Sequence, residues 1–427
     1  MPQTITPARL VELMLAEWIP PGGRVFLAGA SGEPLAITEA LTEAAPRLRG
    51  AEVTMLAVPG VNRCPFLAAA AAGAVRVRSF MSTPDLAAAG PECADCWPLP
   101  LSRLPALLAA EPPFDVGFFQ ISAPDRDGFC SWVGSVDVNP DALARCRRRV
   151  AQVNRRVPAA AGPDARVPFD AFDYVVWDDT GPFVYRPPRI GAVERAIAAH
   201  VAALIPDGST LQVGFGSLPC AVLEALGGKR DLGIHSGMLV DTMVDLVAAG
   251  VITGRCKALD PGRMVATTAL GTERLLAFLG GDVAWLRPVT YTHHPHTLAR
   301  EECLVAVNSA LQVDLSGQAN AEWIDGRRIS GPGGQPDFMG AASRSPSGLA
   351  ILALPSTARR GSVSSIVARL PEGAPVTTPA YDVGFVVTEY GVADLRGRTL
   401  SQRAEALIAI AHPDFRQSLR EQWRRAW

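Results

Sequence analysis

The sequence predicts an α/β protein built from two open, mostly parallel sheets with helices packed against them. Short apolar segments alternate with segments of helical periodicity through both halves of the chain, as crossover helices between parallel strands require. In each half, one apolar strand leads directly into a glycine turn and a helix, at residues 29–32 and 214–216. A chain of 427 residues is also too long for one ordinary core. We therefore expect two domains, residues 1–185 and 186–427, with the active site in the cleft between them.

The first half begins with a helix at residues 9–18, which ends at the Pro-Pro-Gly-Gly run of residues 20–23. Apolar runs and helical periodicity then alternate as far as residue 121. They predict strands at 24–28, 52–58, 75–80 and 116–121, and helices at 66–72 and 103–109.

Residues 157–188 are rich in Pro, Gly and Asp and are typical of a connection between domains. A helix at 189–204 opens the second half. The same alternation then predicts strands at 211–213, 232–234, 264–266, 305–313, 351–355 and 383–388, and helices at 239–249, 272–279 and 400–410.

Composition excludes several classes of protein. A hydrophobic fraction of 48% with 19% charged residues indicates a packed globular chain, and a formal charge of −2 gives no reason to expect binding to nucleic acid or to a membrane surface. The N-terminus lacks the features of a signal peptide and no segment is long and apolar enough to span a bilayer, so we expect a cytoplasmic protein.

Cys93 and Cys96 have no second CxxC pair, and the histidines of 293–296 lack ligand spacing, so we expect no metal.

The chain is organised around residues 211–253. Here a buried strand runs into Gly214-Phe215-Gly216, and Pro219 stands in the first turn of the following helix. A glycine turn leaves backbone N–H groups open to a ligand oxygen, so it suits the stabilisation of an oxyanion. The next strand, 232–234, ends in His-Ser-Gly-Met at 235–238. Two neighbouring strand ends of a parallel sheet would then face one ligand site.

This stretch resembles the acetyl-CoA hydrolase/transferase family, the single-chain class I CoA-transferases. The resemblance continues to the C-terminus in family order, through KALDPGRMVATTALGTERLLAF, VNSALQVDLSGQANAE, SGPGGQPDF, ALPSTARRG, VVTEYGVADLRGRT and IAHPDF. It implies the two-domain fold of that class and an acyl-CoA, with coenzyme A present as the substrate thioester. It also implies a small carboxylic acid as a further partner, and a homodimer.

One departure from the family bears directly on catalysis. Where the family reads His-Thr-Glu-Met, this chain has Gly237 in place of the catalytic glutamate. That glutamate attacks the acyl-CoA carbonyl and then carries CoA as a thioester, and glycine has no atom that can do so. His235 is our first candidate for a general base, because an imidazole has a pKa of about 6.5, and Asp241 is the second. Glu389, or alternatively Glu322, is the candidate substitute nucleophile.

Each candidate also has a structural interpretation. The ring of His235 could fix the strand end, Asp241 could favour its helix N-terminus, and Glu389 could bind backbone N–H groups. Three functions therefore stay open: hydrolysis of a thioester or a C–C bond without a glutamyl intermediate, CoA transfer through a substitute carboxylate, and acyl-CoA binding without catalysis. If the route uses no covalent glutamate, we expect the space beyond Gly237 to admit water or a bulkier acyl group. We expect the acyl-CoA to contact Gly214, Phe215, Gly216, Gly331, Gly333 and Gly334.

Overall fold

A computed structural model describes residues 1–181 and 183–426. Contacts divide the chain into two compact units: the first comprises Met1–Tyr185, Val265–Thr292 and Arg328–Gly333, and the second Arg186–Met264, His293–Arg327 and Gly334–Trp427. The division expected after residue 185 follows sequence order, whereas two segments of the second half pack in the first unit. Backbone hydrogen bonds from Val136 to Thr267 (2.9 Å) and from Val289 to Asp137 (3.0 Å) hold one of these segments there.

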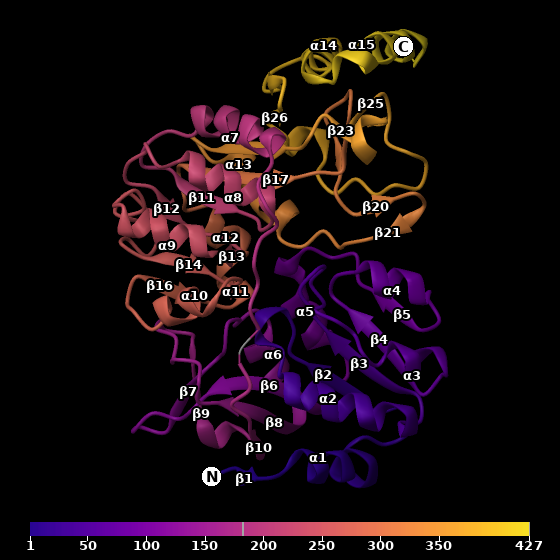
Figure 1. Ribbon diagram of the computed structural model, residues 1–427, viewed down its shortest axis with the longest axis vertical. Helices are drawn as coiled ribbons and strands as arrows, with labels where there is room; N and C mark the ends of the chain where they lie inside the picture. The colour runs from indigo at the N-terminus through magenta and orange to yellow at the C-terminus, as the bar shows by residue number, and fades with distance from the viewer. Residues whose placement is uncertain (182, 427) are drawn as a thin grey trace. The chain divides into compact units, whose positions relative to one another are not determined.

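The first unit contains an eight-stranded sheet in which every neighbouring pair is parallel (Figure 1). In spatial order its strands are β1 (Gln3–Thr4), β10 (Tyr174–Trp177), β8 (Cys146–Asn154), β6 (Phe114–Ser122), β2 (Arg24–Leu27), β3 (Ala51–Met55), β4 (Val75–Ser79) and β5 (Ala94–Cys96). Its helices are α1 (Pro7–Leu13), α2 (Leu35–Ala44), α3 (Leu67–Ala71), α4 (Pro84–Ala89), α5 (Leu104–Ala110), α6 (Asn139–Leu143), α10 (Glu273–Phe278) and α11 (Val289–Thr292). The short strands β7 (Phe129–Ser131), β9 (Arg166–Pro168), β15 (Thr268–Ala269) and β16 (Ala284–Leu286) complete it.

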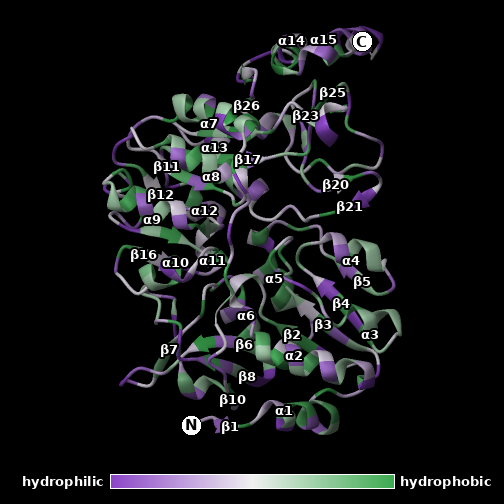
Figure 2. Cartoon of the chain, in the orientation of Figure 1, coloured by the Kyte–Doolittle hydropathy of each residue, from purple (hydrophilic) through white to green (hydrophobic). Residues whose placement is uncertain are grey.

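Both faces of this sheet are buried. Val25, Phe26 and Leu27 follow one another along β2 and are each at most 1% exposed, although successive side chains point to opposite faces. Helix α2 packs by one side: its buried residues recur every three or four positions, and it alternates between hydrophobic and hydrophilic colours along its length (Figure 2).

The second unit contains a six-stranded sheet. In spatial order its strands are β12 (Gly233–Ile234), β11 (Thr210–Val213), β17 (Leu304–Ser309), β22 (Leu349–Ala353), β26 (Phe385–Thr388) and the antiparallel edge strand β27 (Gly391–Asp394). Its helices are α7 (Ala192–Leu204), α8 (Ser217–Ala225), α9 (Asp241–Ala248), α12 (Pro295–Leu298), α13 (Gln335–Arg344), α14 (Leu400–Ile410) and α15 (Pro413–Ala426). Shorter strands are β13 (Met238–Leu239), β18 (Gln312–Asp314), β19 (Ala319–Asn320), β20 (Trp323–Ile324), β23 (Thr357–Ala358), β24 (Val363–Ser364) and β25 (Ile366–Val367). Two strands, β14 (Met264–Ala266) and β21 (Arg327–Arg328), span unit boundaries.

The predicted α/β class with mainly parallel sheets is confirmed, and two of the expected elements differ. The strand expected at 305–313 is two strands, because the chain leaves the main sheet after Ser309 and β18 pairs instead with β19 and β25. The helix expected at 9–18 becomes a π-helical turn from Met14 to Trp18. Within residues 1–181 and 183–426, no helix has the length and apolar character needed to cross a membrane.

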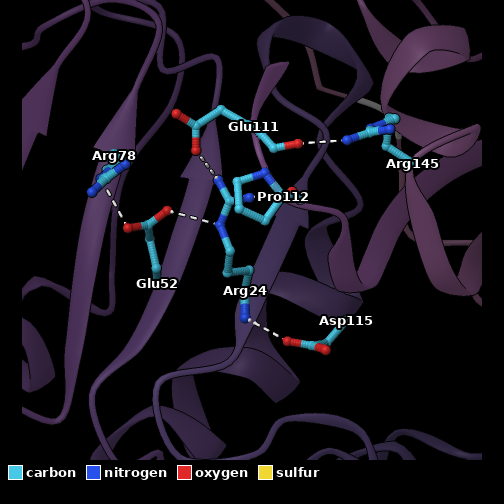
Figure 3. Close-up of polar contacts among 7 residues, drawn as sticks. All are labelled: Arg24, Glu52, Arg78, Glu111, Pro112, Asp115 and Arg145. Carbon is cyan, nitrogen blue, oxygen red and sulfur yellow. Dashed lines mark hydrogen bonds and ion pairs between the residues drawn. The ribbon is translucent and has the colours of Figure 1, made fainter. Parts of the chain in front are cut away.

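Ion pairs join residues of the neighbouring parallel strands β2, β3 and β4 in the first unit (Figure 3). Arg24, at the start of β2, pairs with Glu52 (Nε to Oε1, 3.3 Å) and with Glu111 (Nη2 to Oε2, 2.7 Å). Glu52 also pairs with Arg78 at 2.8 Å, and the backbone N–H of Arg24 donates to Asp115 at 2.9 Å. The side chains of Arg24 and Glu52 are only 15% and 16% exposed, so solvent screens this network less than it screens a surface pair.

We predict that Glu52→Gln lowers the free energy of unfolding by about 1–3 kcal/mol, because it leaves two arginines without a shared carboxylate at nearly constant shape. Urea denaturation would measure the loss. The matched control is Glu12→Gln, since Glu12 pairs with Arg9 in a position where their side chains are 65% and 53% exposed, and this variant should change stability by less than about 0.5 kcal/mol. Equal effects of the two substitutions would contradict a role for the network in stability.

Candidate active site

The carboxyl ends of five parallel strands lie along one edge of the sheet in the second unit. These strands, β12, β11, β17, β22 and β26, end at Ile234, Val213, Ser309, Ala353 and Thr388. The glycine turn, the His235–Gly237 segment and Glu389 each follow one of these ends directly. The structure therefore brings these sequence-predicted residues to the edge where open α/β sheets usually bind ligands.

Ser236 fixes the ends of β11 and β12 to each other. Its hydroxyl donates to the carbonyl of Val213 at 3.0 Å and accepts from the N–H groups of Val213 (3.4 Å) and Met238 (3.3 Å). One residue earlier, the backbone N–H of His235 donates to the carbonyl of Leu211 at 3.0 Å. His235 and Ser236 are both fully buried. These bonds set the position of residue 237 relative to the glycine turn.

The glycine turn ends in a conformation that only glycine adopts readily. Gly216 has φ 110° and ψ −177° and forms the N-cap of α8. Residues 214–217 are partly exposed, whereas the following residues of α8 are buried. The N–H groups in the first turn of a helix have no acceptor within the helix, and they carry the positive end of its dipole. This turn can therefore stabilise negative charge that develops on a ligand oxygen.

A second buried histidine lies next to Gly237. A Cβ atom added to Gly237 would lie 3.4 Å from Nε2 of His293 and 4.0 Å from the ring of Phe338. A Cβ added to Gly334 would lie only 2.5 Å from the same Nε2. The rings of His293 and Phe338 meet edge to face with centroids 4.8 Å apart. The space expected beyond Gly237 is thus bordered by an imidazole, which sequence reasoning did not place there.

The environment of His293 keeps its imidazole neutral. Burial, and to a lesser extent electrostatic repulsion from nearby His235, lower the pKa of His293 to about 3. Only 1% of the His293 surface is exposed. At neutral pH the ring therefore offers one N–H donor and one nitrogen acceptor rather than a positive charge.

The carboxylates expected as substitutes are bound to neighbouring side chains. Both oxygens of Glu389 accept bonds from Ser356, from its backbone N–H at 2.9 Å and from its hydroxyl at 2.6 Å. Glu322 is 3% exposed and accepts a bond from Thr377 at 2.8 Å. Asp241 is the first residue of α9, where a negative charge is favourable. Bonding to backbone was the structural interpretation of Glu389, and its contacts agree with it.

The glycine-rich loop of residues 331–334 contains a boundary between the two units. Gly331 and Gly333 lie in the first unit, where a Cβ on Gly331 would come within 3.1 Å of Cα of Met81 and the carbonyl of Gly333 accepts from the N–H of Leu101 at 3.0 Å. Gly334 lies in the second unit, beside His293. Contact between these glycines and acyl-CoA stays a prediction.

Sequence reasoning also missed an amide pair at this edge of the sheet. Asn308 on β17 donates to the side-chain oxygen of Gln212 on β11 at 2.7 Å, and Gln212 donates back at 3.2 Å. The available signal was a polar residue inside each apolar strand, since buried amides occur where they are paired or used.

The residues considered for a metal do not converge. Among the residues that the structure describes, no group of three or more His, Cys, Asp and Glu side chains could hold a metal ion. His294 and His296 are exposed and stack on each other with centroids 5.3 Å apart, while His293 is buried. Cys93 and Cys96 are both free thiols.

Comparison with known proteins gives consistent matches. Residues 11–185 match the family model described as acetyl-CoA hydrolase/transferase N-terminal domain, and residues 271–423 match the C-terminal domain of the same description. The 4-hydroxybutyrate coenzyme A transferase of Clostridium kluyveri is 43% identical over 314 residues, 73% of each chain. The acetyl-CoA hydrolase of Schizosaccharomyces pombe is 26% identical over 357 residues, 72% of this chain and 65% of that protein.

Two solved structures have similar folds. RipA from Yersinia pestis has a TM-score of 0.91 at 30% identity, covering 99% of this chain and 97% of that one. The 4-hydroxybutyrate CoA-transferase from Porphyromonas gingivalis has a TM-score of 0.81 at 32% identity, covering 100% and 98%.

We predict that alanine substitutions at Gly214 and Gly216 in the glycine turn have different effects on the free energy of unfolding. Gly216→Ala should destabilise the protein by about 1–3 kcal/mol, because its φ and ψ are almost inaccessible to alanine. Gly214→Ala should be neutral or stabilising by up to about 1 kcal/mol, because a Cβ there would meet only Pro219, at 3.8 Å, with no positive φ. Urea unfolding of both variants measures the difference, and a destabilisation shared equally would show that the turn does not have this conformation.

The depressed pKa of His293 predicts an acid-sensitive stability. Between about pH 6.5 and pH 3 the unfolded chain binds a proton at this histidine and the folded chain does not, so stability falls as the pH falls through this window. His293→Asn should flatten that fall. Buried Asp137, whose pKa is raised to about 6, acts in the opposite sense, but it does so in both proteins and cancels in their difference. Identical slopes of unfolding free energy between pH 7 and pH 4 would rule out this account of His293.

Proposed function

The chain belongs to the acetyl-CoA hydrolase/transferase family, and on this premise we propose that it hydrolyses an acyl-CoA thioester without a glutamyl-CoA intermediate. The observation that supports the proposal most directly is which side chains surround Gly237 and Glu389 at the carboxyl ends of the strands. Gly237, which stands at the family's glutamate position by resemblance, adjoins a buried imidazole, and both oxygens of Glu389 are bound to Ser356.

The carboxylates near this edge are poorly suited to replace the glutamate. A nucleophilic carboxylate needs a free oxygen directed at the acyl carbon. Glu389 would have to give up at least one of its two bonds to Ser356, and Glu322 would have to leave a buried position beside Thr377. Water is the acyl acceptor that requires neither change.

In the proposed reaction, the N–H groups at residues 214–216 and at the start of α8 bind the thioester oxygen. Water attacks the carbonyl carbon while His235 takes its proton, and the negative charge develops on the oxygen at the helix N-terminus. The C–S bond then breaks, and the imidazolium returns the proton to the thiolate. The products are a carboxylic acid and free coenzyme A. Asp241 is the alternative base.

A second candidate is CoA transfer to a small carboxylic acid. The observation in its favour is the 43% identity to a protein described as a 4-hydroxybutyrate coenzyme A transferase. This reaction would require one of the bound carboxylates to be released during turnover. For either reaction we also propose a homodimer, by resemblance to the family.

Release of free thiol from a panel of short-chain acyl-CoAs, with and without added acetate, separates these functions. Hydrolysis predicts thiol release at the same rate without acetate. CoA transfer predicts a new acyl-CoA only when acetate is present, and C–C cleavage leaves the thioester intact while the acyl chain changes. An enzyme that transforms no member of the panel, although it binds CoA in calorimetry, would overturn the proposal in favour of a binding protein.

We predict that His235→Gln lowers kcat for thiol release by about 100-fold or more with little change in KM, because glutamine keeps a polar side chain but cannot accept the proton. The matched control is His296→Gln, since His296 is exposed, and it should turn over at the wild-type rate. Asp241→Asn is assayed in parallel. A large loss in Asp241→Asn with full activity in His235→Gln would assign the base to Asp241 instead.

A further inference from the structure

His293 occupies a socket formed by two glycines and an aromatic ring. The backbone at Gly334 lies so close that an added Cβ would come within 2.5 Å of Nε2 and 2.7 Å of Cδ2 of the imidazole. The ring of Phe338 packs against it at 4.8 Å, at an interplanar angle of 64°. The third side of the socket is Gly237. Gly334 and Phe338 thus restrict movement of the ring on the sides where they contact it.

The same ring limits what residue 237 can carry. A Cβ on Gly237 would meet Nε2 at 3.4 Å and Cε1 at 3.6 Å, which is ordinary van der Waals contact. An alanine side chain therefore fits. A glutamate adds four further heavy atoms beyond Cβ, and any of them that extend toward His293, or toward Phe338 at 4.0 Å from Cβ, would overlap these rings. A glutamate must turn aside or displace the histidine.

We propose that His293 determines which reaction this site supports, because its imidazole excludes a nucleophilic carboxylate from position 237. The residues at 237 and 293 are then coupled, because a glutamate at 237 requires a smaller side chain at 293. The consequence for the reaction rests on the proposed function, since it requires an acyl-CoA in the site. The steric coupling itself does not.

Electrostatics act in the same direction as size. A carboxylate at 237 would lose water to a neutral buried ring, which offers no compensating positive charge. An asparagine at 293 is shorter and, like the neutral imidazole, presents an N–H that can donate to the carboxylate. The double variant Gly237→Glu/His293→Asn therefore gains space and keeps a hydrogen-bond donor.

In the double variant the chemistry of CoA transfer is complete. The introduced carboxylate attacks the acyl carbon, the C–S bond breaks, and a mixed anhydride and CoA thiolate form. The thiolate then attacks the glutamyl carbonyl, which releases the first carboxylate and leaves a glutamyl-CoA thioester. A second carboxylate reverses both steps, so no proton or electron is gained or lost.

A four-protein cycle tests the coupling: wild type, Gly237→Glu, His293→Asn and the double variant, each with thermal midpoint and acyl-CoA:acetate exchange rate measured. We expect Gly237→Glu alone to lower the midpoint, and the addition of His293→Asn to recover most of the loss. We expect exchange in the double variant to exceed that of either single variant by about 10- to 100-fold, with a CoA adduct on the introduced glutamate detectable by mass spectrometry.

The matched control is Gly237→Ala, which should leave the midpoint close to that of the wild type because only ordinary contacts form. Additive midpoint shifts, or exchange by Gly237→Glu alone as fast as by the double variant, would overturn the proposal. Coupled midpoint shifts support the exclusion of the side chain by His293 whether or not any acyl-CoA turns over. Absence of turnover in all four proteins would count against the proposed function and not against the coupling.

Discussion

The backbone at residues 237 and 334 packs directly against one buried imidazole, and the candidate site depends on that contact. Glycine is required at 334 because of proximity and not because of backbone conformation: its φ is −90° and its ψ is −1°, values open to any residue, but a Cβ would overlap Nε2 of His293. The neutral ring can be buried because it carries no charge to desolvate. The candidate site therefore has the uncharged ring of His293 next to residue 237, the position at which we infer that covalent transfer would need a carboxylate.

The parallel sheet supplies the surroundings of that contact. Strand ends that lie far apart in the sequence reach the same edge, and short hydrogen bonds fix them there: Ser236 joins β11 to β12, and Glu389 joins β26 to the segment that follows β22. The side chains of Ser236 and Glu389 thus use their polar atoms to hold the backbone in place. The turn at Gly216 differs, because its backbone has a positive φ open to glycine and the start of α8 that follows it is partly exposed.

Local sequence signals predicted the elements that form this edge. The apolar run before Gly214 became β11, the glycine turn became the N-cap of α8, and His235 to Gly237 follow β12 as expected. Such features follow from periodicity and from the special conformations of glycine, which are visible within a few residues.

The position of His293 could not be predicted in this way. It belongs to a histidine-rich segment in which its neighbours His294 and His296 are exposed, and nothing in the local pattern distinguishes the buried ring from the other two. Its contacts with Gly237 and Gly334 depend on where three separate segments meet. The same holds for residues 265–292, which pack in the first unit although they follow the start of the second in sequence.

Isotope labelling tests most directly the central claim, that no carboxylate of the enzyme takes part in acyl transfer. A single turnover of acyl-CoA in ¹⁸O-labelled water, followed by mass spectrometry of the released acid and of the digested protein, traces the attacking oxygen. Direct attack by water predicts one ¹⁸O in the carboxylic acid and none in any peptide. Label in a glutamate or aspartate side chain would contradict the account, because only a covalent acyl-enzyme or glutamyl-CoA intermediate leaves oxygen from water in the protein.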